Sequence, residues 1–487
     1  MSTPTDRFYD ALKSRDRRFD GRFFAGVTST GIYCRPICPA RTPKRDNVRF
    51  FSNAAAAEAA GFRPCRRCRP ETAPGTPAWH GTSATVARAL RLISEGELDG
   101  GSVDDLADRL GVGGRHLRRL FDRHVGASPL AVAQTRRIHF ARKLLDDTEL
   151  PMRDIAFAAG FQSVKRFNTV MRETFGRSPT EIRKVARTEG QDSPEGRIEL
   201  RLPYREPFDW PALLDYFAAR ATPGVEEVVD GEYRRSFAYD DCRGVIRVRR
   251  CEDRPCLVLS APASARRRLM DLAERTRRLF DLGADPVPIA DRLGADPVLG
   301  DVVRRHAGLR VPGAWDPFEL CVRAILGQQV SVKGATTLTG RVAARHGAPL
   351  PPAEQDGGVT LLFPTPETLA TAPLSDLGIP QQRIDAIREL GRRVSARELP
   401  LSWGECHDRT HLALMDVPGI GEWTAQYVAM RALGQPDTFL AGDLGVRRAL
   451  ENGDGMPSAA EALALSERWR PWRAYAVLYL WKKETPA

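Results

Sequence analysis

The chain has 487 residues, of which 42% are hydrophobic and 28% are charged, and its formal net charge is +11. These values are typical of a globular protein with several domains. No run of about 18 apolar residues predicts a membrane helix, and the first 20 residues lack the apolar core of a secretory signal. We therefore expect a cytoplasmic protein whose cysteines stay reduced.

The positive charge is concentrated in the front part of the chain. Residues 1–72 hold 15 Lys and Arg against 7 Asp and Glu, and residues 73–186 hold 18 against 13. The rest of the chain is close to neutral, with 40 against 42. This asymmetry predicts a phosphate-binding front region joined to a part with a separate function. Polar segments rich in Pro and Gly at 69–81 and 187–200 are the expected linkers.

Four of the nine cysteines lie in two tight pairs. Cys34 and Cys38 are in "GIYCRPICPAR", and Cys65 and Cys68 follow in "GFRPCRRCRP", with 26 residues between the two pairs. This spacing is typical of a tetrahedral zinc site with four thiolate ligands. Thiolates on zinc remain nucleophilic at neutral pH, and the arginines around them could present one to a DNA phosphate. The spacing alone leaves a purely structural zinc site open.

The first block resembles the N-terminal zinc domain of the Ada family of adaptive-response proteins. The likeness covers about residues 5–72 and includes "FAGVTSTGIYCRPICPAR" and both cysteine pairs with their flanking prolines. It implies a zinc domain over 1–72 with one Zn²⁺ on the four cysteines. It also implies that Cys34 takes a methyl group irreversibly from a methylphosphotriester in the DNA backbone. Arg41 and Arg63 are the expected DNA contacts.

Residues 102–129 and 151–179 form an internal repeat. Gly111 aligns with Gly160, and each copy predicts a helix, a turn and a second helix that carries cations. Two helix pairs could also form a plain helical bundle. The pattern resembles the double helix-turn-helix domain of the AraC family, which implies an all-α DNA-binding domain over 80–186. Its expected DNA contacts are Arg115, Arg118, Arg119, Lys165, Arg166 and Asn168.

The remainder predicts an α+β subdomain over 196–312 and a helical domain over 313–483. In "LMDVPGIGEWTAQYVAM" a Gly-rich turn contains Gly419 and Gly421, and its N–H groups at the start of a helix can bind a DNA phosphate. Asp443 follows, 22 residues beyond Gly421, at the expected start of another helix. A helix cap for Asp443 and ordinary core positions for the nearby tryptophans are the alternatives.

The segments "FELCVRAILGQQVSV", "PGIGEWTAQYVAMRALG" and "ERWRPWRAYAVLYLW" resemble the AlkA branch of the helix-hairpin-helix glycosylases, across about 200–482. The resemblance implies excision of alkylated purines, with Asp443 as the catalytic carboxylate. Trp423, Tyr427 and Trp481 would bind the cationic base, and Gln329 stands at the position of the wedge that fills the vacated stack.

Two further expectations follow from this likeness. Trp423 stands at the position of the lysine that gives some relatives lyase activity, which implies a monofunctional hydrolase. The backbone carbonyls of Met415, Val417 and Ile420 would hold a monovalent cation at the hairpin.

The whole chain is therefore expected to be a multidomain α+β protein that excises 3-methyladenine-type bases and senses methylphosphotriesters through Cys34 to regulate transcription. The alternative is chiefly a methylation-activated regulator in which the glycosylase domain is secondary. The expected partners are damaged and promoter double-stranded DNA and RNA polymerase, with no membrane. The expected location is the bacterial cytoplasm, at the nucleoid.

Overall fold

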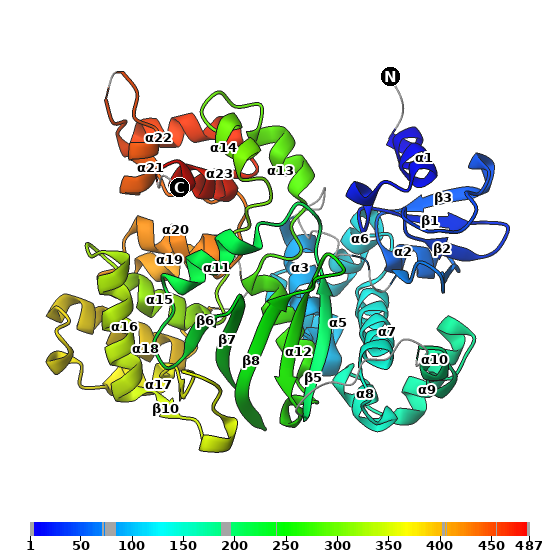
Figure 1. Cartoon of the computed structure of the whole chain (residues 1–487), viewed down its shortest axis with the longest axis horizontal. Helices are drawn as coiled ribbons and strands as arrows, with labels where there is room; N and C mark the ends of the chain where they lie inside the picture. The colour runs from blue at the N-terminus through cyan, green and yellow to red at the C-terminus, as the bar shows by residue number, and fades with distance from the viewer. Residues whose placement is uncertain are drawn as a thin grey trace. The chain divides into compact units, whose positions relative to one another are not determined.

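A computed structural model describes residues 4–70, 73, 84–186, 196–239, 241–401, 405, 407–453 and 455–484 (Figure 1). The chain forms two compact units, which are residues 1–205 with 253–274 and residues 206–252 with 275–487. Among the described helices, none is both long and apolar enough to cross a lipid bilayer.

The first block packs helices on a small sheet, whose strand order is β3-β1-β2-β4. β1 pairs antiparallel with β2 and β3, whereas β2 and β4 are parallel. Because parallel strands end at the same edge, Cys34 at the end of β2 and Cys65 just after β4 lie at one edge of the sheet. The elements are α1 (Pro4–Ser14), β1 (Phe24–Val27), β2 (Ile32–Cys34), β3 (Val48–Phe51), α2 (Ala54–Ala59) and β4 (Arg63–Pro64).

The second block is all-α, and the predicted repeat is present in it. Helix α5 turns into α6 at Gly111, and α8 turns into α9 at Gly160, each with a left-handed backbone (φ +72° and +77°) that favours glycine. Ser102 and Ser163 cap the helices α5 and α9. The helices are α3 (Ala84–Ser94), α4 (Glu97–Gly100), α5 (Val103–Leu110), α6 (Gly114–His124), α7 (Pro129–Asp147), α8 (Met152–Ala158), α9 (Val164–Phe175) and α10 (Pro179–Ala186).

The structure describes only part of the two predicted linkers. The first, 69–81, lies largely outside the described residues. The second is shorter than expected at its C-terminal end, because strand β5 (Arg197–Pro203) begins inside the predicted segment 187–200. Its alternate residues Ile198, Leu200 and Leu202 are buried, which is the period of a strand and not of a linker.

Antiparallel strands open the last part of the chain. β5 pairs with β9 in one unit, and β6, β7 and β8 form a meander in the other. Helix α11 precedes the meander and carries residues of the site described below. The elements are α11 (Trp210–Ala218), β6 (Glu226–Val229), β7 (Glu232–Tyr239), β8 (Cys242–Arg250), β9 (Cys256–Pro262), α12 (Leu269–Leu279), α13 (Pro286–Leu293) and α14 (Gly300–Arg305).

The remaining elements are helical apart from one short hairpin, and their core is aliphatic. Leu320, Ile325, Ile387, Leu414 and Val428 are buried in it, and they come from four different helices. The elements are α15 (Pro317–Leu326), α16 (Val332–His346), β10 (Ala348–Pro349), β11 (Leu361–Leu362), α17 (Pro366–Thr371), α18 (Gln381–Ser395), α19 (His407–Met415), α20 (Glu422–Arg431), α21 (Leu444–Ala449), α22 (Ala459–Ser466) and α23 (Arg473–Glu484).

Candidate functional site

The four paired cysteines lie together, and all are buried. Their Sγ atoms lie within 4.8 Å of one another, and those of Cys38 and Cys65 are 3.9 Å apart. Four sulfurs at 2.3 Å from a tetrahedral zinc ion would be separated by about 3.8 Å. Contacts with Cys38 and Cys65 raise the pKa of the Cys34 thiol well above its ordinary value. The cluster therefore fits a cation that neutralises several thiolates at once.

A cavity of about 500 Å³ opens beside the cluster. Cys34 and two other cysteines line it, together with Arg41 and Arg63, both of which are exposed. Arg66 and Arg67 also face it, so four cations surround the entrance to the thiols. Such a cavity suits a phosphate group next to Cys34.

Arg35, which directly follows Cys34, is not among the arginines that line this cavity. Its guanidinium donates to Asp20 and to the carbonyl of Cys68, and its backbone N–H donates to the Cys68 Sγ atom at 3.3 Å. Because the carboxylate of Asp20 already pairs with its charge, Arg35 holds the loop in place.

Several hydrogen bonds fasten the zinc block to the helical block, and two of these contacts lie next to the cysteines. Glu58 on α2 accepts hydrogen bonds from the hydroxyls of Tyr33 (2.8 Å) and Thr135 (2.5 Å), and it contacts the ring of His139 on α7 (3.1 Å). Burial alone would raise the pKa of Glu58, but these partners outweigh it and hold the pKa below its ordinary value. Tyr33 immediately precedes Cys34, so the thiol is one residue from this contact.

The second fastening involves the zinc loop itself. Arg66, between Cys65 and Cys68, donates to the carbonyl of Phe175 at 2.7 Å. Phe175 is the last residue of α9, the second helix of the second helix-turn-helix. A cation at a helix C-terminus also interacts favourably with the helix dipole.

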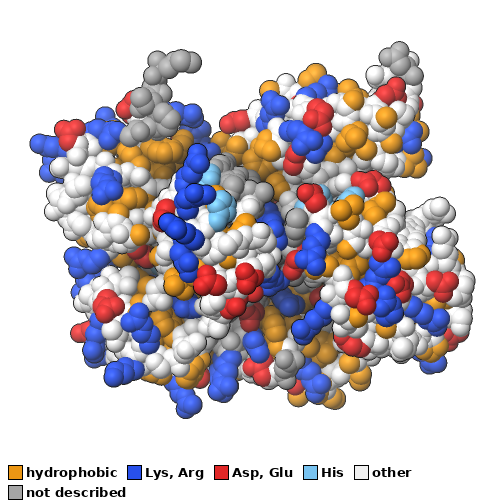
Figure 2. All heavy atoms as spheres, turned by 180° about the vertical axis from the view of Figure 1, so that it is seen from behind, with side chains coloured by type: hydrophobic (Ala, Val, Ile, Leu, Met, Phe, Trp, Pro, Cys, Tyr) orange, Lys and Arg blue, Asp and Glu red, His pale blue; other side chains and the backbone are white. Residues whose placement is uncertain are grey.

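The DNA contacts expected on α6 and α9 lie on solvent-facing positions. Arg115, Arg118, Arg119, Lys165 and Arg166 are exposed, and Asn168 is half-buried. Arg118 pairs with Asp104 on α5 at 3.3 Å, and Arg119 contacts the ring of His116. Figure 2 shows that Lys and Arg on the rear face are interspersed with Asp and Glu. On that face, charge alone therefore does not trace a path for DNA.

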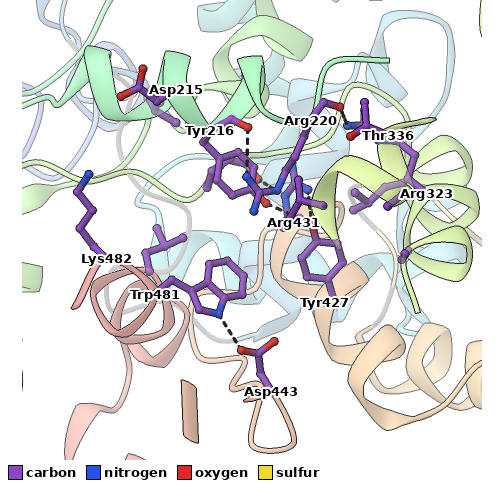
Figure 3. A pocket seen from close by; sticks show the side chains of 18 of the residues that line it. Asp215, Tyr216, Arg220, Arg323, Thr336, Tyr427, Arg431, Asp443, Trp481 and Lys482 are labelled. Atoms are coloured by element: carbon purple, nitrogen blue, oxygen red, sulfur yellow. Dashed lines mark hydrogen bonds between the residues drawn. The ribbon is translucent and has the colours of Figure 1, made fainter. Parts of the chain in front are cut away.

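A second cavity, of about 590 Å³, lies among α11, α15, α16, α20 and α23 in the second unit (Figure 3). We call it the Asp443 cavity. It brings together Asp443 and the three aromatic residues expected to bind a base, although they are up to 58 positions apart in the sequence. Its lining includes Tyr216, Arg220, Arg323, Trp423, Tyr427, Arg431, Asp443 and Trp481.

Asp443 is held by three hydrogen bonds. The indole N–H groups of Trp423 and Trp481 each donate to one of its carboxylate oxygens at 2.9 Å. The backbone N–H of Val446 also donates at 2.9 Å, so Asp443 is the N-cap of α21 as well as a cavity residue. The ring of Trp423 stacks on that of Tyr427, with centroids 5.0 Å apart and planes at 11°. The result is a fixed negative charge beside flat aromatic faces.

The hairpin between α19 and α20 contains both predicted glycines, and both are exposed. Gly419 has φ +89°, a conformation that favours glycine. Gly421 does not itself require glycine, because its backbone is extended (φ −101°) and an added Cβ would meet no atom within 4 Å. Gly421 is the N-cap of α20, where the first N–H groups of the helix have no partner within it. Both positions are open to a phosphate.

Gln329 lies in the loop between α15 and α16. It is exposed and has φ +54°, which costs a non-glycine residue on the order of 1 kcal/mol. The loop is tied down on both sides, since Gln328 donates to the carbonyl of Gly419 at 2.9 Å and Arg383 donates to the carbonyl of Gln328. Gln329 is therefore an exposed side chain on a fixed loop, which is compatible with the predicted role of a wedge in the DNA stack.

The sequence patterns did not reveal several residues of the Asp443 cavity. Tyr216 lies on α11 and Arg220 lies just after that helix ends, about 200 positions before the hairpin motif, and Arg431 lies one turn after Tyr427. The amphipathic segment "WPALLDYFAAR" predicts a helix, but nothing in it marks a base-binding role. Only the three-dimensional arrangement brings it to the cavity.

Four family models match the chain in order. They are described as the metal binding domain of Ada (residues 7–71), a helix-turn-helix domain (106–185), the AlkA N-terminal domain (199–316) and the HhH-GPD superfamily base excision DNA repair protein (322–474). Together they follow the predicted order of zinc, helix-turn-helix and glycosylase parts.

Relatives match both the whole chain and its last part. A probable bifunctional transcriptional activator/DNA repair enzyme AlkA from Mycobacterium tuberculosis is 44% identical over 485 residues, covering 99% of this chain and 97% of that one. DNA-3-methyladenine glycosylase 2 from Escherichia coli is 37% identical over 58% of this chain and 96% of its own. A 3-methyladenine DNA-glycosylase structure from Archaeoglobus fulgidus has the same fold over 58% of this chain and 97% of its own, with a TM-score of 0.51 and 23% identity. This chain belongs to the family of bifunctional transcriptional activator/DNA repair enzymes of the AlkA type.

Proposed function

We propose that this protein excises alkylated purines from DNA, in the manner of a 3-methyladenine glycosylase, and regulates transcription in response to DNA methylation damage. The observation that carries the first part is Asp443, whose carboxylate two indoles hold at the wall of a cavity lined by aromatic rings. The family relationship supports both parts.

The chemistry matches these groups. When the bond between the base and the sugar breaks, its electron pair leaves with the base, and the sugar becomes an oxocarbenium-like cation. The carboxylate of Asp443 stabilises that cation, and water then adds to the sugar. An alkylated purine is itself cationic, so the ring faces of Trp423, Tyr427 and Trp481 bind it more strongly than a normal base.

DNA is held around this cavity without sequence readout. The N–H groups near Gly419 and Gly421 bind a backbone phosphate, and the backbone carbonyls of Met415, Val417 and Ile420 would hold a monovalent cation. Gln329 fills the space that the extruded base leaves in the stack. Because Trp423 replaces the lyase lysine, the reaction ends at hydrolysis.

The regulatory part rests on Cys34 and its cavity. The Sγ atom of Cys34 attacks the methyl carbon of a methylphosphotriester, the carbon–oxygen bond breaks, and the phosphate leaves as an anionic diester. Arg41 and Arg63 bind that phosphate. The four cysteines would hold a zinc ion, which would keep their thiolates reactive at neutral pH. The helices α6 and α9 place their cations on promoter DNA, where RNA polymerase is recruited, in the bacterial cytoplasm at the nucleoid.

The first test is base release by the Asp443→Asn variant. The amide keeps the shape of the side chain but removes the charge, so release of 3-methyladenine from methylated DNA should fall at least about 100-fold. DNA binding, measured by fluorescence anisotropy, should change less than about threefold. A variant with wild-type turnover would move the catalytic role to another residue. A wild-type protein that releases no base, yet binds its promoter after methylation, would favour the alternative of a regulator alone.

A further inference from the structure

The far end of the Asp443 cavity consists of two phenol groups backed by a buried cation. Tyr216 lies on α11, and Tyr427 and Arg431 lie one turn apart on α20. The two phenol oxygens are 3.2 Å apart, and Arg431 donates to the hydroxyl of Tyr427 at 2.5 Å. In Figure 3 Tyr216 and Arg431 lie at the end of the cavity opposite Asp443.

This end of the cavity is held rigidly. Arg431 is 4% exposed and also donates to the carbonyls of Pro312 (2.7 Å) and Gly313 (2.9 Å), so its charge cannot turn away from Tyr427. The guanidinium of Arg220 lies 3.9 Å from the ring centroid of Tyr216.

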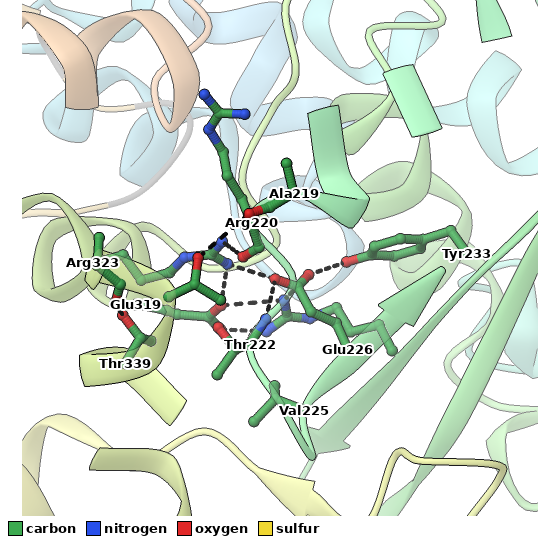
Figure 4. Close-up of polar contacts among 12 residues, drawn as sticks. Ala219, Arg220, Thr222, Val225, Glu226, Tyr233, Glu319, Arg323 and Thr339 are labelled. Carbon is green, nitrogen blue, oxygen red and sulfur yellow. Dashed lines mark hydrogen bonds and ion pairs between the residues drawn. The ribbon is translucent and has the colours of Figure 1, made fainter. Parts of the chain in front are cut away.

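An ion-pair network holds the backbone at Arg220, shortly after Tyr216 in the chain (Figure 4). Arg323 donates to the carbonyl of Arg220 and pairs with Glu226 and Glu319. Arg235 joins the same two glutamates and closes the network. Three of these four paired charges are buried and Arg323 is half-buried, and together they hold the segment after α11 and so restrict movement of Tyr216 relative to α15.

The hydrogens of the two phenols can be counted. An arginine offers only donors, so Arg431 can only donate to Tyr427. One phenol hydrogen lies between the two oxygens, and one is left over. Within the described part of the chain, the hydroxyls of Tyr216 and Tyr427 contact each other and Arg431 and no further acceptor. The pair therefore presents one O–H donor to the cavity.

The charge of Arg431 determines which of the two phenols donates the hydrogen bond between them. Burial would raise the pKa of Tyr427, but the charge of Arg431 outweighs it and lowers that pKa, whereas burial raises the pKa of Tyr216. The more acidic hydroxyl is the better donor, so Tyr427 donates to Tyr216, and successive bonds polarise one another. The remaining O–H is that of Tyr216.

The position of the reaction determines which part of a purine meets this donor. The bond that breaks joins N9 of the base to the sugar, and it must lie at Asp443. The edge of the purine that carries position 6 is farthest from N9 and therefore reaches deepest into the cavity. A 6-oxo group accepts a hydrogen bond from the hydroxyl of Tyr216. A 6-amino group would place its own N–H hydrogens against that O–H and would not accept the bond.

On the basis of the proposed glycosylase function, we infer that Tyr216 is a specificity-determining residue whose hydroxyl donates to the 6-oxo group of alkylated guanines. The bond forms only with 6-oxo purines, so its loss should change the choice among damaged bases and leave the chemistry at Asp443 intact.

The test is the Tyr216→Phe variant of the full chain, acting on one sample of methylated DNA. That DNA contains 3-methyladenine, 3-methylguanine and 7-methylguanine, and chromatography separates the released bases. For both guanines, kcat/KM should fall about three- to tenfold, the effect of one hydrogen bond. For 3-methyladenine it should change less than twofold. Because the three bases are read from one sample, partial unfolding would lower all of them together.

The matched control is Tyr239→Phe, which removes a phenol oxygen on β7 outside the Asp443 cavity and should leave all three rates unchanged. An unchanged ratio of guanine to adenine release in Tyr216→Phe would overturn the inference, as would an equal loss for all three bases. A wild-type protein that releases none of them would overturn the proposed glycosylase function instead.

Discussion

The carboxylate of Asp443 accepts three hydrogen bonds, and together they fix its orientation. The amide of Val446 holds one oxygen from the helix, and the indoles of Trp423 and Trp481 hold both oxygens from the cavity walls. A charge that is already oriented stabilises a developing cation without the cost of reorganisation. The same residue is therefore a helix cap and a candidate catalytic group, and the two roles support each other.

Gly445 gives the carboxylate its space, which leads to a prediction at this scale. An added Cβ would lie 3.3 Å from the Asp443 Oδ1 atom and 3.4 Å from the ring of Trp481. Gly445→Ala should therefore disturb the carboxylate and lower kcat about tenfold. The melting temperature should not fall, because alanine favours a helix more than glycine does.

The neighbouring Gly442→Ala is the control, since its added Cβ would meet no atom within 4 Å. Base release and thermal unfolding of both variants give the comparison. Equal turnover of Gly445→Ala and wild type would show that the position of the carboxylate tolerates this contact.

At the level of elements, the two loops that carry the cysteine pairs lie between one edge of the small sheet and the helices α7 and α9. Parallel pairing of β2 and β4 brings Cys34 and Cys65 together, and the bonds of Glu58 and Arg66 connect this edge to α7 and α9. So small a block buries little apolar surface by itself, so its stability depends on the metal. A change at the cysteines is thus only a few bonds away from α7 and α9.

The metal prediction follows from this arrangement. Protein purified under reducing conditions should contain one zinc per chain by plasma mass spectrometry. Cys65→Ser should lose most of it and lower the unfolding temperature of the zinc block. Cys251→Ser, at a buried cysteine outside the cluster, should keep it. Wild-type protein without zinc would contradict the assignment of the cluster.

At the scale of the whole molecule, the two candidate sites lie in different compact units, the Cys34 cavity in the first and the Asp443 cavity in the second. Local motifs predicted much of each site. Cysteine spacing, a repeat and a Gly-rich hairpin are each encoded by residues within a few dozen positions of one another, so they can be recognised in the sequence. The contribution of Tyr216 could not be predicted, because it depends on packing between segments 200 positions apart. Spacing also could not show that Asp20 neutralises Arg35, or that Gly421 is extended.

Methylation of Cys34 should act as a charge switch. It removes one negative charge from a cavity lined by arginines, so repulsion of the DNA phosphates falls and promoter affinity should rise about tenfold or more at low salt. The gain should shrink as salt rises, because charges near the surface are screened. Titrations of methylated and unmethylated protein at two salt concentrations measure this. Equal affinities at low salt would make the cluster a repair or structural site without a sensing role.

One measurement tests most directly whether a single chain carries two separate activities. Wild type, Asp443→Asn and Cys34→Ala are each incubated with the same methylated DNA, and released bases and methyl groups on the protein are both quantified, by chromatography and by mass spectrometry. Asp443→Asn should lose base release and keep methyl transfer, and Cys34→Ala should show the reverse. If either substitution abolished both products, the two sites would not act independently, and the proposal of two separate activities in one chain would be contradicted.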